Sequence, residues 1–202
     1  MTAPGDTLSG FRKVGSNVHI FPGAKVIGRE HISIGDNVII DDFVFIYATA
    51  PMFIGSYVHI ASFSSVTGGG VVVLEDFSTL SSGVRVLCGS DDFLGGGLTN
   101  STIPGAYRAV TRSHVRIGRH AIIGANTVIL PGVTVGEGCA VGSGSVVTKS
   151  LEPWGVYVGS PARHIKPRPS DLIAESEREL QAERPFEPLT LAMFEAALPK
   201  PT

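Results

Sequence analysis

The stretch IGRHAIIGANTVILPGVTVGEGCAVGSGSVV, which covers residues 117–147, decides the fold. An aliphatic residue returns at every sixth position, beginning at Ile117 and ending at Val147. Neither the 3.6-residue period of an amphipathic helix nor the two-residue alternation of a half-buried strand produces this spacing. A fixed period of this kind is typical of a chain that folds as stacked repeats.

The same rhythm runs through the N-terminal half of the chain. The leading aliphatic residues are Val14, Ile20, Val26, Ile34, Ile40, Ile46, Ile54, Ile60, Val66, Leu74, Leu80, Val86, Ile117, Ile123, Ile129, Val135, Val141 and Val147. A small or β-branched residue follows four positions later, except at Glu30 and Leu151. Three hexapeptides then make one coil of a three-sided column, with the leader inside and the small residue at a corner. The early coils repeat every 20 residues and the later ones every 18, so the early coils carry two extra residues.

The amino-acid composition argues against several classes of function. The 202 residues, 43% of them hydrophobic, suffice for one domain with a sizeable core. A net charge of −2 gives no basic field for nucleic acid or for an anionic membrane. The mean hydropathy is +0.25, but no apolar run approaches the ~20 residues that cross a bilayer, so no membrane insertion is expected. The first residues lack the apolar core of a signal peptide, which favours a cytoplasmic protein.

The rhythm also sets the predicted organisation. We expect an all-β solenoid with an N-terminal lead over 1–13 and a β-helix domain over 14–150. The motif is interrupted over about 88–114, and a loop that long in a tight solenoid usually has a function. A C-terminal extension over 151–202 carries a helix at about 170–184, with a second short helix at 189–198.

Three further stretches carry a family resemblance. They are SDDF at 90–93, LTNSTIP at 98–104 and EPWGVYVGSPA at 152–162. Together with the hexapeptides over roughly 14–168, they resemble the left-handed β-helix acyltransferases. The similarity is closest to acetyltransferases of nucleotide-linked amino sugars, including the dTDP-4-amino-4,6-dideoxyglucose acyltransferases, and to the galactoside and maltose O-acetyltransferases. The resemblance implies a left-handed parallel β-helix, a homotrimer, and acetyl-CoA held between neighbouring columns as co-substrate.

His59 is the first candidate for a catalytic base. It occupies the sixth place of its hexapeptide, so its imidazole faces outward, one coil below Thr79. A histidine there can accept the proton of an acceptor group that attacks a thioester carbon. The alternative is a surface or interface histidine that only bonds to a neighbour.

The loop offers acceptor-binding residues. The O-acetyltransferases are similar in placing a catalytic histidine where this chain has Ser90, Asp91 and Asp92. Three roles stay open for the two aspartates: orienting His59, binding a sugar hydroxyl or amine, or capping the loop. Further candidates for contact with the acceptor are Thr79, Ser90, Asn100, Tyr107 and His120. For His120 the alternative is an exposed turn residue.

The resemblance also assigns a coenzyme site. It implies that the pantetheine arm is lined by Gly124, Ala125, Gly142, Ser143, Thr148 and Lys149. Arg163 and Lys166 match the basic positions that meet the CoA phosphates, and a solvated basic tail is the alternative. Cys88 has no histidine beside it in the sequence, so a nucleophilic thiol is not favoured.

These observations favour direct acyl transfer, with acetyl as the expected group. The acceptor is a sugar, and we expect the amine of a nucleotide-linked amino sugar in the synthesis of surface polysaccharide or lipopolysaccharide. A sugar O-acetyltransferase is the first alternative. A γ-type carbonic anhydrase would need three histidines on zinc, and His114 and His120 do not have that family's spacing. No metal is expected. A scaffold without chemistry is disfavoured by the long loop.

Overall fold

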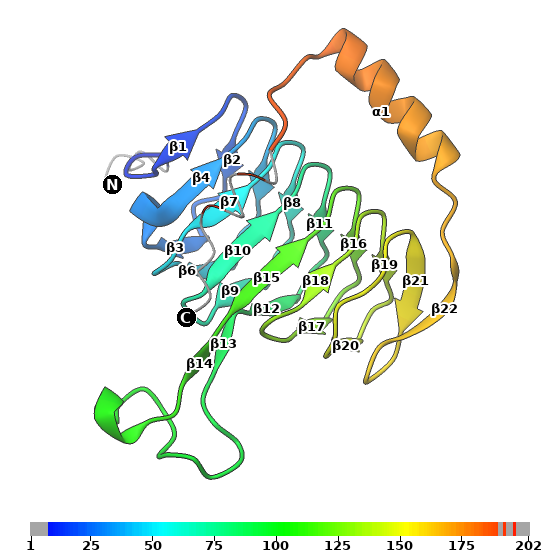
Figure 1. Cartoon of the computed structure of the whole chain (residues 1–202). Coiled ribbons are helices and arrows are strands. Elements are labelled where there is room, and N and C mark those ends of the chain that lie inside the picture. Colours follow the sequence, from blue (N-terminus) through cyan, green and yellow to red (C-terminus); the bar gives the residue numbers. More distant parts are fainter. Residues whose placement is uncertain (1–7, 190–191, 193–195, 197–202) are drawn as a thin grey trace.

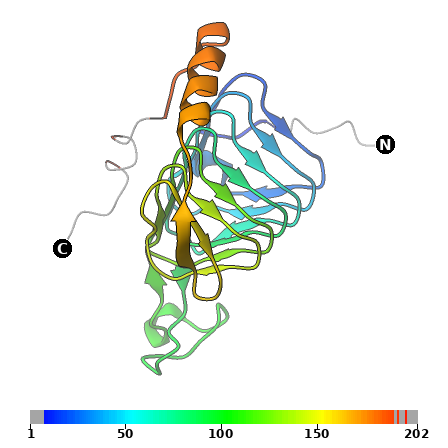
Figure 2. The ribbon, with the colours of Figure 1, turned by 90° about the vertical axis from the view of Figure 1, so that its right-hand side faces the viewer.

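The computed structural model describes residues 8–189, 192 and 196. The chain winds into a parallel β-solenoid of about seven turns, and Figures 1 and 2 show its stacked coils. The all-β solenoid predicted from the six-residue rhythm is therefore confirmed. The second short helix expected at 189–198 falls almost wholly outside the described residues.

Three parallel sheets form the sides of the column. The first sheet holds β1 (Lys13–Val14), β4 (Ile32–Ile34), β7 (Met52–Ile54), β10 (Val71–Leu74), β15 (His114–Ile117) and β18 (Thr134–Val135). The second holds β2 (His19–Ile20), β5 (Ile39–Ile40), β8 (His59–Ile60), β11 (Thr79–Leu80), β16 (Ile122–Ile123), β19 (Ala140–Val141), β21 (Gly155–Val158) and β22 (Arg163–Pro167). The third holds β3 (Lys25–Ile27), β6 (Phe45–Tyr47), β9 (Ser65–Thr67), β12 (Arg85–Leu87), β17 (Val128–Ile129) and β20 (Val146–Val147). The last strand, β22, runs antiparallel to β21 and ends the second sheet.

The hexapeptide leaders stack inside the column. Ile60, Leu80 and Ile123 lie in register on neighbouring coils, and the solvent reaches none of the three side chains. Each leader thus packs against the leaders above and below it. This arrangement explains why the spacing tolerates Ile, Val or Leu and little else.

We name the corners by the sheets that they join: the first corner lies between the first and second sheets, the second between the second and third, and the third between the third and first. Several aromatic residues turn the first two corners with a positive φ, which costs a bulky residue about 1–2 kcal/mol. Tyr57 and Phe77 stack at the first corner with ring centroids 5.0 Å apart, and His120 stacks on Phe77 at the same distance. Phe43 and Phe63 stack at the second corner, 5.1 Å apart. Two corners therefore carry a column of rings on their outer side.

Short polar side chains tie the coils together at the first corner. The backbone N–H of Asp36 donates to the hydroxyl of Ser56 at 2.9 Å, and the N–H of Ser56 donates to Oδ1 of Asp76 at 2.7 Å. Asp76 is only 1% exposed. Each turn thus binds an orphan amide of the coil before it.

The long loop leaves at the third corner. Its two ends pair as antiparallel strands, β13 (Gly89–Ser90) and β14 (Thr111–Arg112), and Figure 1 shows the loop projecting from the column. A short 3-10 turn at Gly105–Tyr107 lies near its tip, and a second one at Arg29–His31 belongs to the early coils.

The chain after β22 folds back over the first corner. Helix α1 (Asp171–Glu183) lies along the column on the side away from the loop, as Figure 2 shows. Contacts of the segment 184–189 reach Tyr57, Asp76 and Lys13, so this segment returns toward the early coils. No helix in the described part of the chain is both long and apolar enough to cross a bilayer.

Candidate active site

His59 lies on the outer face of the second sheet. Strand β8 places it in register between Ile39 of β5 and Thr79 of β11, and its side chain is 44% exposed. Its Nε2 atom lies 3.2 Å from Oδ2 of Asp41, which stands at the second corner of the preceding coil. The structure therefore brings His59 together with a carboxylate that the sequence analysis did not identify.

Asp41 is itself held in place. Its Oδ2 atom accepts the backbone N–H of Ser62 at 3.3 Å, with the Ser62 hydroxyl at 3.5 Å. The carboxylate of Asp41 therefore lies beside Nε2 of His59, which leaves Nδ1 as the second ring nitrogen. An exposed imidazole beside a carboxylate is an arrangement that can serve proton transfer.

The loop aspartates bond within the loop. Asp91 pairs with Arg108, whose Nη2 lies 2.7 Å from Oδ1, and Asp91 also accepts the backbone N–H of Asn100 at 3.1 Å. The hydrogen bond from Arg108 lowers the pKa of Asp91 below its ordinary value. Asp92 accepts the backbone N–H groups of Leu94 and Gly96. Of the three roles left open for these residues, shaping the loop is the one seen in this structure.

The same loop encloses a hollow of about 590 Å³. It is lined by Asp91, Asp92, Phe93, Gly95, Gly97, Thr99 and Asn100. Three of the predicted site residues thus gather here. Ser90 lies at the loop base, where its hydroxyl donates to the carbonyl of Asp91 at 2.8 Å, and Tyr107 is 65% exposed in the 3-10 turn.

His120 lies elsewhere, at the first corner beneath α1. Its Nε2 atom is 2.6 Å from Oε2 of Glu177, and its side chain is only 9% exposed. His120 is therefore a turn residue but not an exposed one. It is separated from the face that carries His59, and its visible partners are the ring of Phe77 and the carboxylate of α1.

The predicted coenzyme residues fall into three groups. Gly124, Ala125, Gly142 and Ser143 turn the second corner of the later coils. Thr148 and Lys149 follow β20 at the third corner and are exposed. Arg163 and Lys166 lie on β22, also exposed. These groups line different edges of one column rather than a single cavity.

Two of those glycines are also required by packing. A Cβ atom at Gly124 would approach the backbone nitrogen of Ser143 to 2.5 Å. One at Gly142 would lie 2.8 Å from Cγ1 of Val158. Real Cβ atoms do not come that close, so stacking of the coils alone explains both residues.

The cysteines have the environment of structural thiols. Cys88 is 2% exposed, and its sulfur accepts the N–H of Gly70 at 3.2 Å. Burial raises the pKa of the Cys88 thiol and, likewise, that of Cys139. Among residues 8–189, 192 and 196, no three His, Cys, Asp or Glu side chains gather as a metal site would require.

Asp41 was missed because its partner is distant in the sequence. It precedes His59 by 18 residues, and the two become neighbours only because the coils stack, with β5 paired to β8. The available signal was the 20-residue repeat, which stacks residues of neighbouring coils. A shift of one 20-residue coil places Asp41 directly below Ala61, and Ala61 is two residues after His59.

Comparisons with known proteins agree with this geometry. The sequence pattern described as Bacterial transferase hexapeptide (six repeats) matches residues 114–149. The chain is 38% identical over 165 residues to the dTDP-4-amino-4,6-dideoxy-D-glucose acyltransferase of Escherichia coli, an alignment that covers 81% of this chain and 86% of the relative.

Solved structures give the same answer. AntD, an N-acyltransferase from Bacillus cereus in complex with dTDP and 3-hydroxybutyryl-CoA, superposes with a TM-score of 0.80 at 39% identity, over 86% of this chain and 92% of AntD. A variant of AntD in complex with dTDP-4-amino-4,6-dideoxyglucose and coenzyme A also gives 0.80, at 38% identity and the same coverage. The chain therefore belongs to the hexapeptide-repeat acyltransferases and shares their left-handed β-helix fold.

Proposed function

We propose that the protein transfers an acyl group from acyl-CoA to the amine of a dTDP-linked 4-amino sugar. Both kinds of relative support this acceptor, since the E. coli enzyme is an acyltransferase of that sugar and an AntD variant holds it beside coenzyme A. Acetyl is the donor that we favour, and 3-hydroxybutyryl is the second candidate because AntD binds that thioester.

The observation that carries the proposal is the His59–Asp41 pair. Nε2 of His59 and Oδ2 of Asp41 lie 3.2 Å apart on the outer face of the second sheet. The His59 side chain is 44% exposed, so a substrate can reach the imidazole. In the reaction the sugar nitrogen attacks the thioester carbon, the C–N bond forms, and the C–S bond breaks with the electron pair staying on sulfur. Nδ1 of His59 takes the proton that the nitrogen loses and passes it to the sulfur, so coenzyme A leaves as the thiol, while Asp41 fixes the ring. Backbone N–H groups stabilise the oxygen that carries the developing charge.

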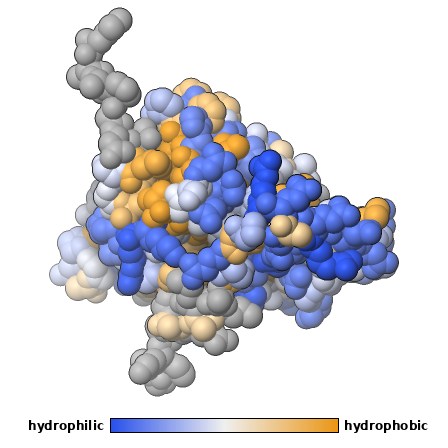
Figure 3. Space-filling model, turned by 90° about the horizontal axis from the view of Figure 1, so that it is seen from above, coloured by the Kyte–Doolittle hydropathy of each residue, from blue (hydrophilic) through white to orange (hydrophobic). Residues whose placement is uncertain are grey.

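The second corner is the proposed meeting place of the copies. Phe43 and Phe63, whose stacked rings are 63% and 59% exposed, project there, and Ile39 nearby is 44% exposed. Figure 3, which looks down on the side that carries α1, shows an apolar area on one flank of the molecule. Uncovered apolar area of this kind marks an interaction surface. We propose a homotrimer whose columns meet along this corner and hold the pantetheine arm against Gly124 and Gly142.

The decisive assay follows release of the coenzyme A thiol. Wild type is offered acetyl-CoA or 3-hydroxybutyryl-CoA, with dTDP-4-amino-4,6-dideoxyglucose or with dTDP-glucose, which has a hydroxyl at C4 in place of the amine and a further hydroxyl at C6. We expect turnover only with the amine. Use of dTDP-glucose at an equal rate would instead establish a sugar O-acyltransferase. Light scattering on the same sample measures the mass and tests the trimer.

Variants then test the base. His59→Ala should lower kcat by at least about 100-fold, the usual scale for losing a general base, and should leave the affinity for coenzyme A unchanged. His31→Ala is the matched control, because His31 has a similar exposure of 41% and pairs with Glu30. Asp41→Asn should lower kcat less than His59→Ala does. Equal rates for His59→Ala and wild type would refute His59 as the base.

A further inference from the structure

The C-terminal arm, defined here as residues 171–189, is held to the column in an unusual way. Its helix α1 buries none of its 13 residues, so no apolar core secures it. Glu177 is one of four partly buried residues on the helix, the others being Ile173, Leu180 and Gln181, and only 18% of its side chain is accessible. A helix without buried residues needs another source of stability in order to dock.

Glu177 supplies that attachment through two partners on the first corner. Nη2 of Arg119 donates to Oε1 of Glu177, and Nε2 of His120 lies 2.6 Å from Oε2. Gln181, one turn further along α1, donates to Oε1 at 3.0 Å. Both carboxylate oxygens are thus satisfied by the first corner and by the helix itself.

Arg119 is shared between the arm and the column. Its Nη1 atom donates to Oδ2 of Asp76 at 2.7 Å, and its guanidinium carbon lies 4.9 Å from the ring centroid of Phe77. Asp76 is fixed by the coil before it. Arg119 therefore links the buried carboxylate of Asp76 to the carboxylate of Glu177 on α1.

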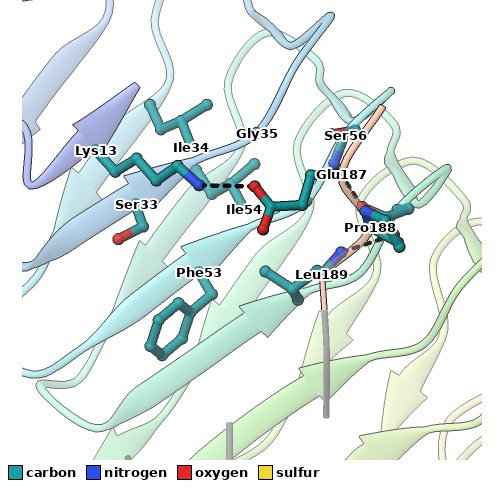
Figure 4. A pocket seen from close by; sticks show the side chains of 12 residues that line it. Lys13, Ser33, Ile34, Gly35, Phe53, Ile54, Ser56, Glu187, Pro188 and Leu189 are labelled. Atoms are coloured by element: carbon teal, nitrogen blue, oxygen red, sulfur yellow. Dashed lines mark hydrogen bonds and ion pairs between the residues drawn. The ribbon is translucent and has the colours of Figure 1, made fainter. Parts of the chain in front are cut away.

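The far end of the arm has an anchor that does not depend on Glu177. The backbone N–H of Leu189 donates to Oδ2 of Asp76 at 3.1 Å, and Phe186 packs edge-on against Tyr57 with centroids 5.2 Å apart. Figure 4 shows this end of the arm above the first sheet, with Glu187 reaching Lys13 at 3.3 Å.

The space under α1 is incompletely filled. A cavity of about 360 Å³ lies between the helix and the first corner. Its lining residues are Phe77, His120, Leu172, Ile173, Ser176, Glu177 and Leu180. The ion pairs of Glu177 cross this gap. Loss of those pairs leaves α1 held by the apolar side chains that line the cavity, of which Ile173 and Leu180 are only partly buried.

We propose that the arm is a strap with an ionic latch: the charge of Glu177 closes α1 over the ring column, and loss of that charge opens α1 while residues 186–189 stay anchored. Opening exposes the rings of Phe77 and His120 and the cavity beside them. The latch does not rest on the proposed acyl transfer, and its test requires no substrate.

The direction of the pH effect follows from the groups that face Glu177. They are Arg119 and His120 on the corner and Gln181 on the helix, with Asp76 behind Arg119. Burial raises the pKa of Glu177, but the hydrogen bonds from Arg119 and His120 outweigh burial and hold it below the ordinary value. A carboxyl whose pKa is lowered by docking stabilises the docked state above its ordinary range and loses that effect as pH falls through the lowered value. Acid therefore weakens the pairs of Glu177. Burial also raises the pKa of Asp76, so the bonds that Asp76 accepts from Arg119 and Leu189 weaken at a higher pH than those of Glu177, and Glu177→Gln rather than acid isolates the latch.

Trypsin and amide hydrogen exchange test the latch directly, because Arg178 lies within α1 and offers a cleavable bond, whereas Arg184 is followed by proline and is not cut. Glu177→Gln removes the charge with little change of shape, and Glu179→Gln, on the same helix and exposed, is the matched control. We expect cleavage at Arg178 and exchange of α1 amides to rise about ten- to a hundredfold in Glu177→Gln, the scale of a lost charged hydrogen bond. Glu179→Gln should behave like wild type.

Two results would overturn the latch. Rates in Glu177→Gln equal to those of wild type would show that α1 is held by its apolar contacts. A rise spread equally over α1 and the strands around Leu80 would show a general loss of stability rather than a strap that opens alone. Exchange measured on both regions in one sample separates these outcomes even if the variant is less stable.

Discussion

Replacing Leu80 by alanine should cost far more stability than replacing Ile20 by alanine, although each change removes three carbon atoms. Transfer of those carbons to water accounts for about 2.4 kcal/mol at either site. Leu80 is fully buried between Ile60 and Ile123, and the register of three strands fixes all three leaders. The resulting cavity is closed at both ends and cannot collapse, which brings the expected loss to about 4–5 kcal/mol.

Ile20 has a leader on one side only. Its strand β2 is the edge of the second sheet and pairs with β5 alone, and the side chain is 5% exposed. We therefore expect about 2–3 kcal/mol for Ile20→Ala. Urea denaturation followed by far-ultraviolet circular dichroism, at one fixed protein concentration, gives both values against wild type. Equal losses at the two sites would refute the view that stability is a sum of contacts between neighbouring coils.

Three further changes have defined outcomes. Gly28→Ala should destabilise the protein by about 2 kcal/mol or more, measured as a lower Tm, because φ is +78° and a Cβ would overlap the carbonyl oxygen of Ala48. The thiols of Cys88 and Cys139 should react with a thiol reagent at least about 100-fold more slowly in the folded protein than in urea, since burial raises both pKa values. Asp92→Ala should speed proteolysis within the 88–114 loop while changing the unfolding midpoint little, because its two hydrogen bonds lie inside the loop.

The column could be predicted from the sequence because an aliphatic residue returns at every sixth position along the chain. Every sixth residue faces the interior, so burial of Ile60, Leu80 and Ile123 follows from their spacing alone. The break in the rhythm likewise located the loop, whose paired ends begin at Gly89. Local periodicity carries this information without any knowledge of distant contacts.

The site could be predicted only in part. Position in the hexapeptide placed His59 on an outer face, which the structure also shows. Orienting His59 was one of three roles left open for the loop aspartates, but Asp91 pairs with Arg108, 17 residues further along the loop. The carboxylate that lies beside His59 is that of Asp41, which comes from another coil. Residues that become neighbours because two coils stack are far apart in the sequence, so a short motif does not reveal them.

The stacked aromatic rings at the first and second corners differ in how far the chain itself covers them. At the first corner Phe186 packs on Tyr57 and Phe77, and Glu177 pairs with His120, so the arm covers those rings. At the second corner Phe43 and Phe63 keep most of their surface exposed. Both corners place bulky residues in the same costly backbone conformation, so a cover for the rings is expected at each. The arm supplies it at the first corner. The second corner, where four of the six predicted pantetheine residues also lie, is the edge that the proposed trimer would cover. Opening of the strap and assembly of the copies would then act on different edges of the column.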